Sequence, residues 1–178
     1  MHARLAETMS FVEEKRRELM TSIDGVPREN LSRRTGPEAW SVAEILDHLQ
    51  LVESGVARLI AKRVTKAKEA GIGEEQSSTS VMASFDGHRS RLESSILQSP
   101  ETVRPKQNAD IDEAVEALTA SREALRAAVA GADGIALGEI KHTHAVLGEL
   151  DLYQWLIFLG NHEVRHRKQI ERTLKSIS

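Results

Sequence analysis

Cysteine is absent from the 178-residue sequence. This absence excludes a disulfide framework, a thiolate nucleophile, an iron–sulfur cluster and a cysteine-ligated zinc finger. Any metal site must therefore use His, Asp or Glu side chains. Aromatic residues are also scarce, with two Trp, one Tyr and three Phe, which is too few to predict a platform on which nucleic-acid bases stack.

A strong charge of one sign and a long apolar segment are both lacking. The 24 basic and 27 acidic residues give a formal net charge of -3, so no overall field attracts nucleic acid or anionic lipid. The longest apolar stretch, Trp155–Gly160, is far shorter than the roughly 20 residues that cross a membrane. The acidic, amphipathic N-terminus lacks the apolar run of a signal peptide. We expect a soluble, cytoplasmic protein that binds neither nucleic acid nor membrane.

The sequence is instead rich in helix-forming residues, with few β-branched runs. Apolar residues recur at helical spacing in four long segments, which are about Arg4–Ile23, Ser41–Gly71, Asp110–Ala130 and Asp151–Lys175. Ser41 followed by Glu44, and Asp151 followed by Gln154, are capping-box patterns that mark the start of the second and fourth helices. Gly71 is suited to end the second.

Two long connections separate these helices. Residues 71–109 lack a sustained apolar stripe and contain one predicted short helix, Ser84–Leu97. A connection of this length is uncommon in a compact domain unless it crosses over or covers something. Residues 131–150 are expected to form a loop that includes His142 and His144. The sequence therefore predicts an all-α fold, a single domain over residues 1–178 that forms a four-helix bundle with a long crossover between helices 2 and 3.

The fourth helix has two histidines where core residues are expected. With Leu152 at 0° and about 100° per residue, the apolar stripe lies within roughly 60° of zero. His162 then falls near about 280° and His166 near about 320°, inside the same sector. Two imidazoles at i, i+4 on one helix face can bind the same metal ion. A hydrogen-bonded core histidine is the more common case, so the spacing alone leaves both interpretations open.

Two polar residues of the second helix also lie near its apolar stripe. His48 is about 80° from the centre of the stripe, on its flank, and Glu53 lies almost on the stripe itself. A carboxylate at a buried position needs a partner. Spacing alone does not identify His48 as a third metal ligand.

Two segments of the chain resemble the DinB/YfiT-like family. Residues 40–53 read W-S-V-A-E-I-L-D-H-L-Q-L-V-E, which is similar to the family's first signature of a Trp-Ser/Thr start, then Glu-Ile, then His-Leu on a helix. Residues 144–170 read H-A-V-L-G-E-L-D-L-Y-Q-W-L-I-F-L-G-N-H-E-V-R-H-R-K-Q-I. This segment resembles the family's loop, its Trp-Leu helix and its H-x-x-R-H-x-x-Q-I ending. The two segments occur in the family's order.

The resemblance implies a bundle in which three histidines hold a divalent metal ion, and by position these are His48, His162 and His166. Three imidazoles suit Zn, Ni or Fe, and the positions left open make such a site catalytic in type. The metal would activate either water or a low-molecular-weight thiol supplied from outside. The resemblance thus implies a hydrolase or a thiol S-transferase with a small-molecule substrate, and a homodimer.

Several alternatives stay open at this point. Glu53 could accept a hydrogen bond from a metal-bound imidazole, or it could pair with an Arg across the bundle. The family often has His-Pro in the loop before the last helix, whereas Ala145 follows His144 here. His144 could line a pocket, although a surface position is favoured, and His142 is expected to be solvated. The protein could also be a non-catalytic metal- or ligand-binding bundle, or a metal-free interaction protein.

Overall fold

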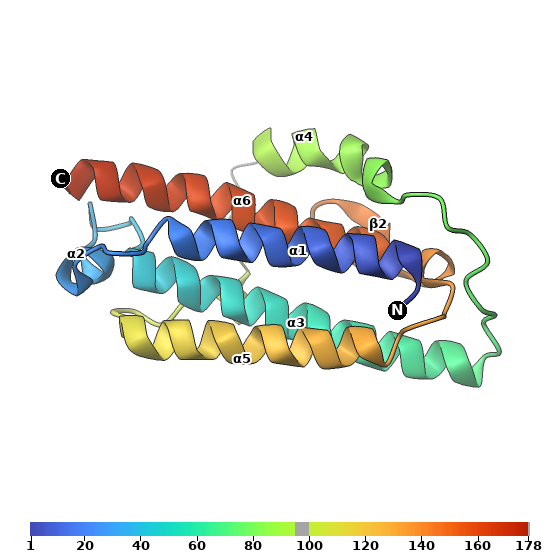
Figure 1. The fold of residues 1–178 in the computed structure, drawn as a ribbon. Helices are drawn as coiled ribbons and strands as arrows, with labels where there is room; N and C mark the ends of the chain where they lie inside the picture. The colour runs from blue at the N-terminus through green and yellow to red at the C-terminus, as the bar shows by residue number, and fades with distance from the viewer. Residues whose placement is uncertain (95–99, 178) are drawn as a thin grey trace.

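Four long helices pack side by side in the computed structural model, which describes residues 1–94 and 100–177 (Figure 1). They are α1 (Ala3–Thr21), α3 (Val42–Glu69), α5 (Ile111–Ala130) and α6 (Leu152–Ile177). Helix α1 packs against α6, α3 packs against α5, and α3 also contacts α6. The predicted four-helix bundle is confirmed, with helix bounds close to those expected from the periodicity.

Both predicted capping boxes are present. The Ser41 hydroxyl accepts the backbone N–H of Glu44 at 3.2 Å, and the Glu44 carboxylate accepts that of Ser41 at 2.8 Å. Asp151 and Gln154 make the same reciprocal pair at 2.9 and 3.0 Å. Each pair satisfies two amides that have no partner within the helix. These caps fix where α3 and α6 begin, and therefore which side chains face the interior.

The described residues of the connection between α3 and α5 form three short helical segments, η1 (Met82–Phe85), α4 (Asp86–Ser94) and η2 (Glu101–Val103). Segments η1 and α4 contact α6, whereas η2 contacts α3. The predicted helix Ser84–Leu97 corresponds to the end of η1 and to α4, and its last three positions lie outside the described residues. The connection therefore covers parts of α3 and α6, the two helices that carry His48, His162 and His166. A covering role is one of the two that its length predicts.

Residues 131–150 differ from the predicted loop. They contain a turn, η3 (Leu137–Glu139), and an antiparallel hairpin of β1 (Lys141–His144) and β2 (Gly148–Asp151). His142 lies opposite Leu150 in this hairpin. Gly148 begins the second strand with a φ of 84°, a backbone conformation that glycine adopts at little cost. The mostly helical fold thus includes one small sheet, and also a short helix α2 (Arg28–Ser32) that the periodicity does not predict.

Apolar side chains fill the space between the helices. Val12 of α1, Ile45 of α3, Leu125 of α5 and Leu156 of α6 are among those that are fully buried. Within the part of the chain that the structure describes, no helix combines the length and the apolar character needed to cross a membrane.

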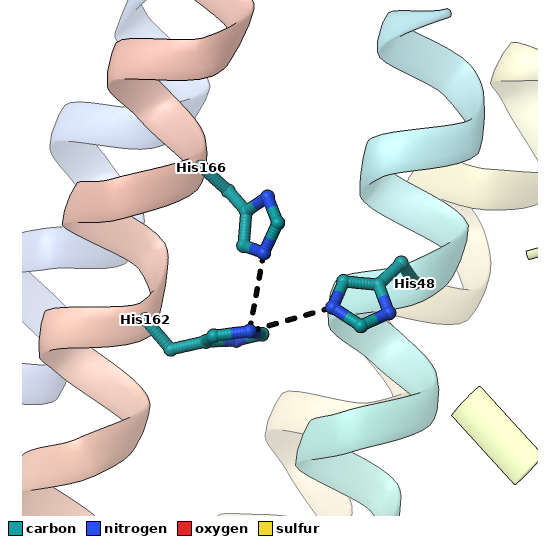
Figure 2. A group of neighbouring side chains, drawn as sticks. All are labelled: His48, His162 and His166. Carbon is teal, nitrogen blue, oxygen red and sulfur yellow. Dashed lines mark hydrogen bonds between the residues drawn. The ribbon is translucent and has the colours of Figure 1, made fainter. Parts of the chain in front are cut away.

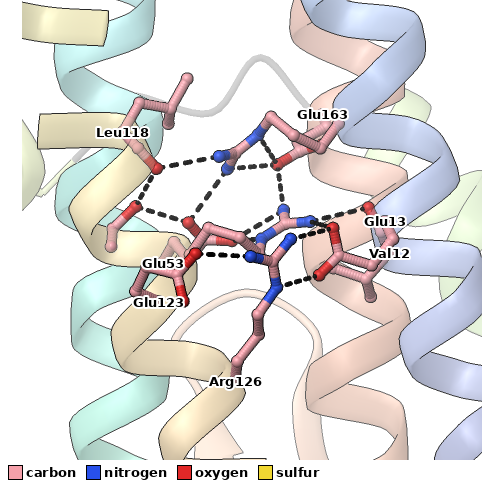
Figure 3. A network of polar contacts seen from close by, with 10 residues as sticks. Val12, Glu13, Glu53, Leu118, Glu123, Arg126 and Glu163 are labelled. Atoms are coloured by element: carbon pink, nitrogen blue, oxygen red, sulfur yellow. Dashed lines mark hydrogen bonds and ion pairs between the residues drawn. The ribbon is translucent and has the colours of Figure 1, made fainter. Parts of the chain in front are cut away.

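A buried ionic network joins all four helices (Figure 3). Arg16 of α1 donates to Glu163 of α6 at 2.7 Å and to Glu53 of α3 at 3.0 Å. Arg122 of α5 donates to the same two carboxylates, at 2.8 Å each. Two arginines thus face two glutamates inside the bundle, so the desolvated charges are paired.

Candidate metal centre

Three histidines converge where α3 and α6 face each other. Figure 2 shows His162 and His166 on α6 pointing toward His48 on α3. The Nε2 atom of His162 lies 3.4 Å from that of His48 and 3.1 Å from that of His166. All three candidate ligand atoms lie within 4.8 Å of one another, and all three side chains are buried. The structure therefore brings together the two histidines that periodicity places in the core and the one that only the resemblance implies.

The outer nitrogens of two of these rings fix the position of the ring proton. His48 Nδ1 lies 2.6 Å from the backbone carbonyl oxygen of Val103, in η2. His166 Nδ1 lies 2.8 Å from Oε1 of Gln169. Each of these oxygens only accepts a hydrogen bond, so each Nδ1 carries the proton. In a neutral imidazole the other nitrogen, Nε2, then carries a lone pair and accepts. His48 and His166 therefore both direct an Nε2 lone pair toward the centre of the cluster.

This arrangement fits a bound cation. A proton on His162 Nε2 would have to serve two inward lone pairs, whereas a cation attracts all three nitrogens. Zn–N bonds of about 2.0–2.1 Å at a tetrahedral angle place two nitrogens about 3.3 Å apart. The two observed separations, 3.4 and 3.1 Å, lie close to that value. All three ligand atoms lie within 4.8 Å of one another, so the donor set suits a divalent metal.

The protonation state of the three histidines also favours metal binding. Burial lowers the pKa of all three imidazoles, to about 3 for His166 and well below the ordinary value for His162. Mutual repulsion between the rings adds to the shift for His162 and His166. The imidazoles are thus neutral near pH 7, and the neutral form is the one that binds metals.

A cavity of about 1060 Å³ opens beside the cluster and is lined in part by all three histidines. Its apolar walls include Trp40, Trp155 and Phe158. The Phe158 ring stacks on His162 with 5.2 Å between ring centroids, and Trp40 lies 5.1 Å from His48. A small molecule in this cavity would therefore lie directly against the candidate ligands.

Two expectations about the hairpin histidines need correction. His144 lines the cavity and is partly buried between Trp155 and Phe158, rather than lying on the surface. His142 also lines the cavity, stacked on Trp155 and hydrogen-bonded to Arg63 at 2.6 Å, rather than being solvated. The missed hairpin is the reason, because β1 folds both side chains back over the start of α6.

Glu53 lies in the ionic network and not beside the cluster. Its carboxylate accepts hydrogen bonds from Arg16, Ser121 and Arg122. Of the two roles left open by the sequence, the structure places Glu53 in the pairing with arginine across the bundle. Within the described residues, the group of possible metal ligands contains the three histidines and no carboxylate.

Sequence reasoning misses the two groups that orient the rings. Gln169 stands three residues after His166, on the same helix face, and this spacing is a signal that could have identified it. Val103 contributes only its backbone carbonyl, so its side chain gives no signal. Its position depends on the path of the connection from α3 to α5.

Nearly the whole chain is similar to known proteins. A family model described as the DinB superfamily matches residues 12–170 of the chain. The chain belongs to the DinB superfamily. The uncharacterized protein YuaE of Bacillus subtilis (strain 168) is 27% identical over 169 residues, which cover 95% of this chain and 98% of YuaE. The crystal structure of TT2238, a four-helix bundle protein, has a TM-score of 0.62 and 20% identity, covering 94% of this chain and 98% of that one. The four-helix-bundle fold is thus shared with that protein across nearly the whole chain.

Proposed function

We propose that this DinB superfamily protein is a metal-dependent enzyme in which His48, His162 and His166 hold one divalent metal ion. The observation that supports this most strongly is the pair of inward lone pairs, fixed by the Val103 carbonyl and by Gln169. A single proton on His162 Nε2 cannot satisfy two buried lone pairs at once, whereas a cation attracts all three nitrogens. Zn, Ni and Fe are the metals that such a donor set suits.

The residues around the cluster would each contribute to catalysis. The Val103 carbonyl and Gln169 would hold two imidazoles in the tautomer and orientation that ligation needs. Trp40 and Phe158 would exclude bulk water from the cluster and provide an apolar surface for a small-molecule substrate. The metal would supply Lewis acidity, which lowers the pKa of a water molecule or a thiol.

Two reactions follow from this arrangement, hydrolysis and thiol S-transfer. The chain has no cysteine, so the thiol of a transferase reaction would come from an external low-molecular-weight compound. A non-catalytic metal protein would usually close the coordination shell with a fourth side chain, and Glu53 lies instead in the ionic network. An enzyme is therefore the better supported candidate. The cytoplasmic location and the homodimer stay predictions.

The metal site is tested by elemental analysis of untagged protein after exchange into metal-free buffer. We expect about one equivalent of Zn, Ni or Fe in the parent protein, and loss of tight binding in His48→Ala and in His162→Ala. His88→Ala is the matched control, because His88 is a histidine outside the cluster. Far-UV circular dichroism should show that all variants keep their helices.

Two outcomes would contradict the metal site. One is a full equivalent of tightly bound metal in His162→Ala. The other is no metal in the parent even after titration with divalent ions. Once metal is bound, the two reactions are separated by assaying the loaded protein against activated esters and against electrophiles with a panel of thiols. Turnover that needs a thiol identifies a transferase, and turnover without one identifies a hydrolase.

A further inference from the structure

The cavity beside the three histidines has an excess of positive charge. Four arginines line it, Arg34, Arg104, Arg165 and Arg172, and Glu38 is the one carboxylate side chain among the described lining residues. The chain as a whole has a net charge of -3. The positive cavity is therefore a local feature and not a consequence of overall composition.

The four arginines differ in how far their charge is already neutralised. Arg34 is bound to Glu44, the residue that completes the cap of α3. Arg165 donates a hydrogen bond to the carbonyl oxygen of Leu92. Arg104 and Arg172 are exposed and make no ion pair with the described residues. These two guanidinium groups are therefore available to a ligand that enters the cavity.

The hairpin adds two further hydrogen-bond donors. His144 Nδ1 accepts the backbone N–H groups of Val146 and Leu147, at 3.1 and 3.2 Å. His142 Nδ1 accepts from Arg63 at 2.6 Å. A neutral imidazole whose Nδ1 accepts must have its proton on Nε2. Both rings therefore present an N–H donor, and not an acceptor, as their remaining polar group.

We infer that this cavity binds a small molecule with an anionic group, a carboxylate or a phosphate, which the exposed guanidinium groups of Arg104 and Arg172 recognise. Guanidinium groups form strong charge-assisted hydrogen bonds with both anions. The aromatic walls formed by Trp40 and Trp155 indicate that the molecule also has an apolar part. That this molecule is the substrate rests on the proposed function. That the cavity binds an anion does not, because none of these groups is a candidate metal ligand.

The two tryptophans of the protein both line the cavity, so intrinsic tryptophan fluorescence reports directly on its occupancy. The test titrates benzoate, phenyl phosphate and the neutral analogue benzamide into metal-loaded protein and, in parallel, into chelator-treated protein. We expect saturable binding of at least one anion with a Kd at least about tenfold lower than that of benzamide, in both preparations. The tighter of the two anions identifies the group that the site prefers.

Substitutions assign the binding to the named residues. Arg172→Gln and Arg104→Gln should each raise the Kd of the anion by about five- to tenfold and leave that of benzamide unchanged. Arg17→Gln, an exposed arginine of α1 outside the cavity, is the matched control and should change neither. Because Arg104 and Arg172 are exposed, these variants are expected to fold.

The inference is overturned if neither anion binds, if benzamide binds as tightly as the anions, or if the two cavity variants bind the anion like the parent. Anion selectivity that appears only in metal-loaded protein, and is unaffected by both variants, also overturns it, because the metal would then be the recognising group. If the protein binds no metal but prefers the anions to benzamide in a way that depends on Arg172, only the proposed function is contradicted.

Discussion

Orientation of a histidine ring depends here on single neighbouring atoms. Gln169 accepts the Nδ1–H of His166 and so directs the Nε2 lone pair toward the other two rings. Gln169→Ala removes this acceptor and should weaken metal binding by about tenfold or more, because partners of metal-bound histidines contribute that much to affinity. Competition with a chromogenic chelator measures the change.

A matched substitution separates the hydrogen bond from packing at the same position. Gln169→Glu keeps an acceptor oxygen three residues after His166 and should retain affinity near that of the parent. If Gln169→Ala binds the metal like the parent, the orienting role of this side chain is wrong. If Gln169→Glu is as weak as Gln169→Ala, the contribution comes from something other than the acceptor.

His144 should stay neutral at pH values where an ordinary histidine is protonated. Burial lowers its pKa, as does the nearby His88, and the other titratable rings on its side of the cavity are His142 and His162. In the unfolded chain the same group titrates near pH 6.5. The unfolded state therefore binds more protons below that pH, so the contribution of His144 to stability is present above it and is lost as the pH falls.

Nitrogen-15 spectra of the histidine rings test this assignment in zinc-loaded protein. We expect His144 to appear at pH 6 as the neutral tautomer with the proton on Nε2, since Val146 and Leu147 donate to Nδ1. The ring of His88, which is not among the residues that line the cavity, is recorded in the same spectrum for comparison with His144. A proton on Nδ1 of His144, or a titration midpoint near about 6.5, would contradict the donor role given to this residue.

At the residue scale, the sequence predicts side chains better than it predicts backbone groups. His162 and His166 follow from helical periodicity, because a histidine in an apolar stripe is visible in the sequence. His48 lies on a flank and is indicated only by the resemblance. The Val103 carbonyl has no sequence signal, since any residue could supply it. Its contact with His48 depends on tertiary structure.

At the scale of elements, α6 packs tightly against α1 at Gly160. A Cβ atom at this position would lie 2.3 Å from a ring carbon of Phe11, so the ring must move to accept it. Gly160→Ala should therefore destabilise the protein by about 1–3 kcal/mol despite the higher helix propensity of alanine. The midpoint of urea unfolding measures the effect.

Gly55 provides the matched control on α3, because a Cβ atom there meets nothing within 4 Å. Gly55→Ala should stabilise the protein by about 0.5–1 kcal/mol through propensity alone. Combining Gly160→Ala with Phe11→Leu should recover part of the loss. If the two glycine variants are equally stable, the Phe11 ring makes room for a Cβ atom at position 160 without a measurable loss of stability.

The helices and the hairpin differ in how well the sequence predicts them. Helices α3 and α6 have long apolar stripes and capping boxes, so several independent signals agree. The strands Lys141–His144 and Gly148–Asp151 are four residues each and bury a single side chain, Leu150. Such strands lack the alternation of apolar and polar residues on which strand prediction depends. This error also affects the predicted site, because a loop without the hairpin gives no reason to place His142 and His144 beside the cavity.

At the scale of the whole molecule, the network of Arg16, Glu53, Arg122 and Glu163 joins helices that are far apart in the sequence. Glu163 directly follows His162, so the network also fixes the face of α6 on which the cluster lies. Glu53→Gln removes one of the two central negative charges. Arg16 and Arg122 then share Glu163, and Arg122 keeps its pair with Glu13 at 3.2 Å. Breaking a buried pair in this way should cost about 3–5 kcal/mol of unfolding free energy.

Urea unfolding of chelator-treated protein measures this cost separately from any stabilisation by metal. The control is Glu149→Gln, which breaks the exposed pair of Glu149 with Lys141, 3.1 Å apart, and should change the unfolding free energy by less than about 1 kcal/mol. A loss of similar size in both variants would mean that the buried charges are already screened by water. A large loss in Glu53→Gln alone, with weaker metal binding in the folded variant, would show that the same four charges hold the bundle together and keep His162 in register with His48.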